Sequence, residues 1–202
     1  GTTRRSSEEL AADFVRDIRE GFGPEHTRAG AIKAGTCSTE ELWDVERTVL
    51  RAAALAAKET GAPILTHTQA GRLGHDQLDV FESAGLDLSQ VCVGHLDRNL
   101  EEDYLVSLAR RGVWLGLDQW TKDKYGHDTD RAAMVRRLVD AGHTKVMVSG
   151  DLGRGSYQRA YGGSPGLGAC LTAIRKALGD ELAELTLVAN PAAFLAFREA
   201  GR

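Results

Sequence analysis

Pro63-Ile64-Leu65-Thr66-His67 is a short apolar run that ends in a histidine, and runs of this kind decide the fold of the chain. Four others occur at residues 29–33, 91–95, 113–117 and 145–151. Short, near-continuous apolar runs are typical of strands that a parallel sheet buries on both faces. Because helical patterns separate the runs, the sequence predicts five strand-plus-helix units of an α/β protein.

Helix start and stop signals bound these units. Residues 6–9, Ser-Ser-Glu-Glu, have the pattern of a capping box that opens a helix, and Gly21 lies where this helix ends. Asn190-Pro191 has the cap and first-turn chemistry of another helix start. The later helices are predicted at about residues 39–60, 74–84, 100–111, 128–141, 165–177 and 190–199. The strands are predicted at about residues 28–34, 63–67, 91–94, 113–117 and 145–149.

The bulk properties exclude several classes of protein. A net charge of −4 and a pI near 5.9 argue against a nucleic-acid-binding surface. No run approaches the roughly 18 apolar residues of a membrane span, and no apolar stretch follows the first arginines as in a signal peptide. Three widely spaced cysteines form no disulfide or zinc pattern. We therefore expect one cytoplasmic domain over residues 1–202, without nucleic-acid or membrane partners.

Four side chains that could bind a metal stand at the ends of the apolar runs: Lys33, His67, His95 and Asp151. His67 and His95 are 28 residues apart, and Asp151 follows after twice that interval, with the run at residues 113–117 between them. The carboxyl ends of parallel strands share one edge, where α/β proteins keep their active sites. Taken singly, a histidine that closes a strand is more often a packing or hydrogen-bonding residue than a metal ligand, and Asp151 could cap the next helix. Taken together, the four predict a metal site.

Two architectures fit five such units, an open doubly wound sheet and part of a (β/α)₈ barrel. An open sheet concentrates its site at one switch point, whereas a barrel lets several strands converge on one centre. The ligand pattern favours the barrel. A complete barrel needs eight strands, so three strands are expected to be missing from the front of this chain.

Four motifs resemble the consecutive metal motifs of the phosphotriesterase family, a group of binuclear metal hydrolases in the amidohydrolase superfamily. They lie, in order, at residues 31–36, 66–68, 94–99 and 149–151. The resemblance implies the fourth to eighth strands of a (β/α)₈ barrel. It also implies two divalent metal ions, with Zn²⁺ preferred over Mn²⁺, Co²⁺ or Fe²⁺. Lys33, carboxylated by CO₂, would bridge the ions; His67 and His95 would hold one, and Asp151 the other. A metal-bridging hydroxide would attack the substrate, with Asp151 taking up or shuttling its proton.

The chain departs from the family pattern in two ways. No His-x-His pair occurs anywhere in the sequence, although the family carries one on its first strand. We expect this pair upstream of Gly1 or on another polypeptide. Because a five-stranded piece leaves two open edges, we also expect a homodimer or a complementary N-terminal segment. Gln119 follows Asp118 where organophosphate-degrading members have a histidine, so that proton relay is not expected.

The loops after the last two strands indicate the substrate. Lys124, Arg154 and Tyr157 match residues that hold the phosphate in a branch of the family that opens phosphorylated sugar lactones. A lysine, an arginine and a phenol hydroxyl suit a phosphate dianion. The alternative is that Lys124, and more so Lys122, lies on a solvated loop rich in aspartate.

We therefore predict a metal-dependent hydrolase that opens lactones, with Asp151 and Lys33 as its catalytic residues. One alternative keeps the metal centre but makes the substrate an organophosphate triester or an aryl ester. Another is a catalytically silent partial barrel that acts as a binding module or as half of a split enzyme.

Overall fold

Five parallel strands form one sheet in the computed structural model, which describes residues 5–199. Their order in the sheet is their order in the chain, and each strand pairs with the next. The strands are β1 (Ile32–Gly35), β2 (Ile64–His67), β3 (Val91–Val93), β4 (Trp114–Leu117) and β5 (Val146–Val148). All five lie where the apolar runs predicted them, and the α/β class is confirmed. The first strand starts later than expected, because its pairing with β2 begins only at Ile32, opposite Ile64.

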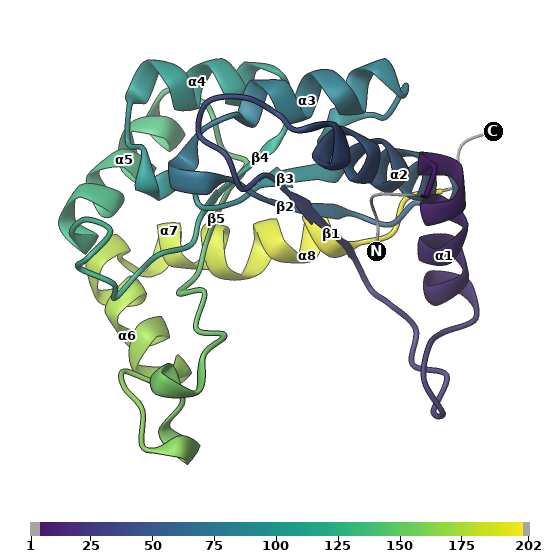
Figure 1. Ribbon diagram of the computed structural model, residues 1–202. Helices are drawn as coiled ribbons and strands as arrows, with labels where there is room; N and C mark the ends of the chain where they lie inside the picture. The colour runs from purple at the N-terminus through teal and green to yellow at the C-terminus, as the bar shows by residue number, and fades with distance from the viewer. Residues whose placement is uncertain (1–4, 200–202) are drawn as a thin grey trace.

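One face of the sheet is covered by the helices that connect the strands (Figure 1). Strand residues that point to this face are fully or almost fully buried, as Ile64, Val91 and Leu115 show. Such crossovers between parallel strands place their helices on one side when every connection has the same hand. The connecting helices are α2 (Asp44–Thr60), α3 (Gly74–Ser83), α4 (Glu102–Arg110) and α5 (Asp128–Asp140). Helix α1 (Ser7–Arg19) precedes β1 and packs against α2, and α6 (Leu167–Leu178) follows β5 and contacts α5. The capping box expected at Ser6 and Glu9 is present.

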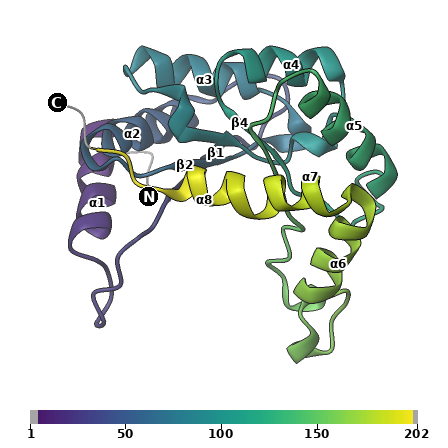
Figure 2. The same cartoon turned by 180° about the vertical axis from the view of Figure 1, so that it is seen from behind.

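A single continuous helix lies on the opposite side of the sheet (Figure 2). It consists of α7 (Asp180–Glu184), one π-helical turn (Leu185–Ala189) and α8 (Asn190–Leu195). The α-helical segment α8 begins at Asn190 with Pro191 in its first turn, as predicted, but Asn190 does not cap it, because the backbone before it is already helical. Its amide instead donates to the carbonyl oxygens of Thr144 and Val146, each at 2.7 Å. Asn190 thus ties the helix to the start of β5.

The π-helical turn explains how Pro191 is tolerated inside this helix. A proline lacks an N–H and clashes with the preceding turn of an α-helix. Directly before Pro191, the Asn190 N–H bonds to the carbonyl of Leu185, a wider turn than the α-helical one. A sequence pattern that marks a helix start therefore marks a local widening here.

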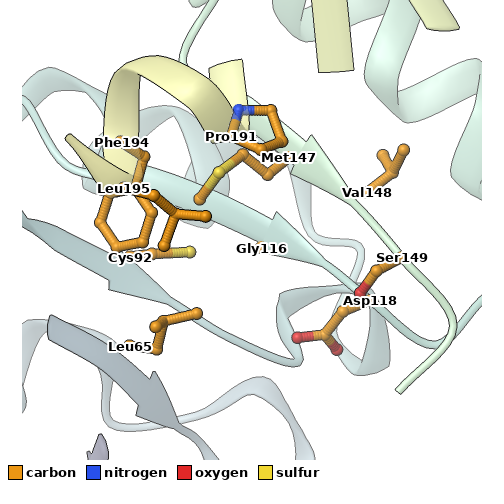
Figure 3. Close-up of a pocket in the computed structure, with 10 residues that line it drawn as sticks. All are labelled: Leu65, Cys92, Gly116, Asp118, Met147, Val148, Ser149, Pro191, Phe194 and Leu195. Carbon is orange, nitrogen blue, oxygen red and sulfur yellow. The ribbon is translucent and has the colours of Figure 1, made fainter. Parts of the chain in front are cut away.

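The strand residues that face α8 form a second, smaller apolar cluster. Trp114, Cys92 and Phe194 are its buried members, and the rings of Trp114 and Phe194 have centroids 5.9 Å apart. A pocket of about 170 Å³ lies within this cluster (Figure 3). Figure 3 shows Asp118 and Ser149 at one end of the pocket, away from Phe194. The same strand ends carry the candidate site. None of the helices within residues 5–199 is both long and apolar enough to cross a membrane.

Candidate active site

A polar cavity of about 260 Å³ lies at the carboxyl ends of the strands. Six of the seven residues predicted for the site line it: His67, His95, Asp151, Lys124, Arg154 and Tyr157. Lys122, Tyr125 and Gly153 complete the lining. The strand-end histidines and the residues of the two later loops thus meet in one place, as the shared edge of a parallel sheet requires.

The two histidines are in direct contact. His67 is the last residue of β2, and its ring meets that of His95 edge to face at a centroid distance of 4.6 Å. His95 lies just beyond β3 in a left-handed conformation, with φ at 61°. Partial burial, assisted by His95, lowers the pKa of His67. His67 is therefore neutral at pH 7, the form of imidazole that can bind a metal.

Asp118 orients His95 from the end of β4. Its Oδ1 lies 2.5 Å from Nδ1 of His95, and its Oδ2 accepts the backbone N–H of His95 at 3.2 Å. A Cβ atom at position 94 would lie 2.5 Å from the carbonyl oxygen of Thr66. Only a glycine therefore fits at position 94, between Thr66 and Asp118. A carboxylate on one ring nitrogen leaves Nε2 of the imidazole for a metal. No sequence pattern predicted this role of Asp118, although its place directly after an apolar strand was a usable signal.

Gln119 lies between the His95–Asp118 pair and Asp151. Its Nε2 lies 2.8 Å from Nδ1 of His95 and donates to Asp118 Oδ1 at 3.0 Å and to Asp151 Oδ2 at 3.2 Å. An amide does not titrate, so this link holds side chains in place without carrying a proton. The side chain is buried, with 2% of the residue exposed.

Lys122 is buried beneath Asp151, which corrects the interpretation of this lysine as solvated. Only 5% of the residue is exposed. Its Nζ donates to Asp151 Oδ2 at 2.8 Å, to the Asp151 carbonyl at 2.7 Å and to Gln119 Oε1 at 3.1 Å. Partial burial of Asp151 raises its pKa, but the hydrogen bonds from Lys122 and Gln119 outweigh this and leave the pKa lowered. Asp151 is therefore a carboxylate at neutral pH.

A buried ion pair holds the loop that carries these residues. Arg131 and Asp97 are both fully buried at the side chain, and Arg131 Nε lies 2.8 Å from Asp97 Oδ2. The same Asp97 oxygen accepts the backbone N–H of Gln119 at 2.7 Å. Arg131 also donates to the carbonyls of Tyr125 and Gly126. Residues 119–126 are thereby fixed from two ends, a role of Arg131 that no sequence pattern indicated.

The residues predicted to hold a phosphate lie on the outer side of the cavity. Lys124 and Arg154 are exposed, and Tyr157 is half-buried. Lys124 Nζ lies 4.7 Å from the ring centre of Tyr125, and hydrogen bonds with Tyr125 and Tyr157 raise the pKa of Lys124. Lys122 Nζ lies 5.0 Å from the ring centre of Tyr157. Cations thus outnumber the single carboxylate of the lining.

Lys33 is the one predicted site residue that does not line this cavity. It is the second residue of β1, and its exposed side chain donates from Nζ to the Thr66 carbonyl at 3.0 Å. The register of the sheet pairs Lys33 with Leu65 and Gly35 with His67. Lys33 therefore lies on the strand beside His67, one layer below it.

The donors present suit a divalent metal ion in chemistry, but they are incomplete in number. Two contacting imidazoles and a carboxylate in one cavity are the ligand types of zinc sites. Among residues 5–199, however, no group of three or more His, Cys, Asp and Glu side chains is close enough to hold an ion. The chain therefore offers part of a metal site.

Comparison with known proteins gives the same family that the sequence motifs resemble. Residues 1–195 match the model of the Phosphotriesterase family. A phosphotriesterase homology protein of Mycobacterium tuberculosis is 43% identical over 136 residues, which cover 67% of this chain and 41% of that protein. A phospho-furanose lactonase of Mycoplasmopsis synoviae is 33% identical, over 77% of this chain and 47% of that protein.

The fold of the chain also has a solved counterpart. The crystal structure of a lactonase from Listeria monocytogenes superposes with a TM-score of 0.92 and 29% identity, covering 98% of this chain and 63% of that one. The chain spans about half the length of the curated relatives it matches.

Proposed function

Because the chain belongs to the phosphotriesterase family, we propose that it forms the catalytic part of a metal-dependent hydrolase that opens phosphorylated lactones. Hydrolase relatives, among them a lactonase and a phospho-furanose lactonase, support the class of reaction. The single observation that carries the proposal is the shared cavity. It joins two imidazoles and Asp151 to an outer group of Lys124, Arg154 and Tyr157.

The inner group would hold the metal ions. His67 and His95 would bind one ion, Asp151 the other, and a carboxylated Lys33 both. The ions, when bound, would polarise the lactone carbonyl and make water a nucleophile near neutral pH. Further ligands are needed, because the described residues supply too few. We propose that they come from a segment or partner that carries a His-x-His pair.

The outer group would bind the phosphate. Arg154 offers a planar fork that suits two phosphate oxygens, and Lys124 adds an exposed ammonium. Tyr157 contributes a hydroxyl. Because the phosphate is remote from the bond that breaks, its binding energy would orient the lactone ring over the inner group. Asp151, a carboxylate at neutral pH, would then accept the proton that water loses during attack.

A substrate panel tests this proposal. The complete protein, supplied with Zn²⁺, would be assayed with a phosphorylated sugar lactone, its unphosphorylated analogue and an organophosphate triester. We expect the highest kcat/KM for the phosphorylated lactone, because only this substrate uses both groups of the cavity. Equal rates for the two lactones would remove the phosphate claim, and a preference for the triester would replace the reaction.

One observation favours a second candidate, a catalytically silent binding module. The described residues hold no complete set of metal ligands. Metal analysis separates the two functions. About two Zn²⁺ ions per chain in the complete protein support the hydrolase, whereas none supports the silent module.

A further inference from the structure

Lys122 is the least expected charge in this molecule. It lies five residues after the end of β4, and only 4% of its side chain is exposed. A buried ammonium is costly unless it is paired and hydrogen-bonded. The burial of Lys122 must therefore be compensated by specific partners, whereas Lys124, two residues later, is exposed and needs none.

The partners of Lys122 account for every one of its donors. An ammonium has three N–H groups, and Lys122 Nζ has three acceptors: Asp151 Oδ2, the Asp151 carbonyl and Gln119 Oε1. No donor is left for a substrate. The chemistry of Lys122 is therefore directed at Asp151 and not at a ligand in the cavity.

Asp151 is held in an unusual backbone conformation at the same point. Its φ is 44°, in the left-handed region that residues other than glycine rarely adopt. Lys122 bonds both the backbone carbonyl and the side chain of Asp151, so one ammonium fixes both. The Lys122 and Gln119 bonds occupy Oδ2, whereas Oδ1 accepts no hydrogen bond from the residues that the structure describes.

We propose that Lys122 is a positioning residue, which holds Asp151 in its left-handed conformation and presents Oδ1 to the cavity. That Lys122 supports catalysis in this way rests on the proposed function. That Lys122 fixes the conformation of Asp151 rests on the observed hydrogen bonds alone. Gln119 serves as the second contact, because it bonds Lys122, Asp151 and also Asp118, the carboxylate that orients His95. The Asp151 carboxylate and the His95 imidazole are thereby kept in one arrangement.

The structural arm of the test compares crystal structures of the complete protein and its Lys122→Met variant. Methionine keeps the length and apolar stem of lysine but removes all three donors. We expect Asp151 to leave the left-handed region and its carboxylate to turn. An unchanged φ and carboxylate in the variant would overturn the proposal. Should Lys122→Met fail to fold, Lys122→Leu, which also removes all three donors, carries the same comparison.

The kinetic arm uses the Zn²⁺-loaded protein and a phosphorylated lactone. We expect Lys122→Met to lower kcat about 10- to 100-fold, as losses of supporting contacts do, with KM changed less than about threefold. Lys124→Met should show the opposite split, because it removes a substrate contact. Lys176→Met, the same substitution on the exposed side of α6, should change neither. A Lys122→Met variant that raises KM and keeps kcat would make Lys122 a substrate ligand and overturn the proposal.

The two arms separate failure of the inference from failure of the proposed function. If the unsubstituted protein hydrolyses no lactone, the proposed function fails, and the crystal structures still decide whether Lys122 positions Asp151.

Discussion

The polar cavity and the apolar pocket are built on the same strands, one layer apart. The cavity takes its residues from the strand ends and the loops beyond them, and its lining is rich in charge. The pocket takes Leu65, Cys92 and Met147 from within the strands and closes them against α8 (Figure 3). Burial alone therefore does not distinguish functional residues from residues of the stabilising core, because Lys122 and Arg131 are buried as deeply as the apolar core. A buried residue supports the site when it forms hydrogen bonds with residues that line the cavity, and otherwise it belongs to the core.

The largest effect is expected at Asp151. Asp151→Asn keeps an oxygen acceptor for Lys122 but removes the base, so lactone hydrolysis should fall about 10²- to 10⁴-fold. The measurement is kcat/KM of the complete, Zn²⁺-loaded protein, with Lys176→Met as the control. Activity within about tenfold of the unsubstituted protein would place the base elsewhere.

Arg131 tests whether a buried group that supports the cavity behaves like core. Arg131→Met leaves Asp97 buried and unpaired, so the free energy of unfolding should fall by about 3–5 kcal/mol. Urea denaturation measures this loss. The double variant Arg131→Met/Asp97→Leu should regain part of it, since no orphan charge remains. A single variant as stable as the unsubstituted protein would show that the pair adds nothing.

Phe194 tests the apolar pocket. Phe194→Ala should lower the free energy of unfolding by about 3 kcal/mol, because the ring is 4% exposed and packs on Trp114. Hydrolysis at 25 °C should stay unchanged. Phe197→Ala, which removes a ring that is 47% exposed, is the matched control and should change stability by no more than about 0.5 kcal/mol. Equal losses for the two variants would contradict the core role of Phe194.

The smallest effect is expected at the outer edge of the cavity. Arg154→Ala should raise KM for a phosphorylated lactone about 10- to 100-fold, the loss of charge-assisted hydrogen bonds worth about 1.5–3 kcal/mol. KM for the unphosphorylated analogue should not change. Arg159→Ala, on the same loop but outside the cavity lining, is the control. An equal rise for both lactones would assign Arg154 to loop structure.

Sequence patterns predicted the strands and the residues at their ends because both depend on local chemistry. The five apolar runs became the five strands, and His67, His95 and Asp151 came to one cavity. The pattern at Asn190-Pro191 placed the start of α8 but missed the π-helical turn that joins it to α7, so Asn190 is not a cap. There, contacts with residues 144–146 override the local signal.

The supporting residues could not be predicted, because their roles exist only across long separations in the chain. Lys122 meets Asp151 29 residues away, and Arg131 meets Asp97 34 residues away. In the sequence, Lys122 stands among aspartates and has the pattern of a solvated loop. Only the folded chain brings a carboxylate over it and removes the water.

The α/β class, the strand positions and the family of this protein could therefore be predicted from local sequence patterns. The tertiary structure decided which charges are buried, which carboxylate orients His95 and which lysine holds Asp151. The physical reason is that strand formation follows from neighbouring residues, whereas the burial of a charge depends on partners that only folding brings together.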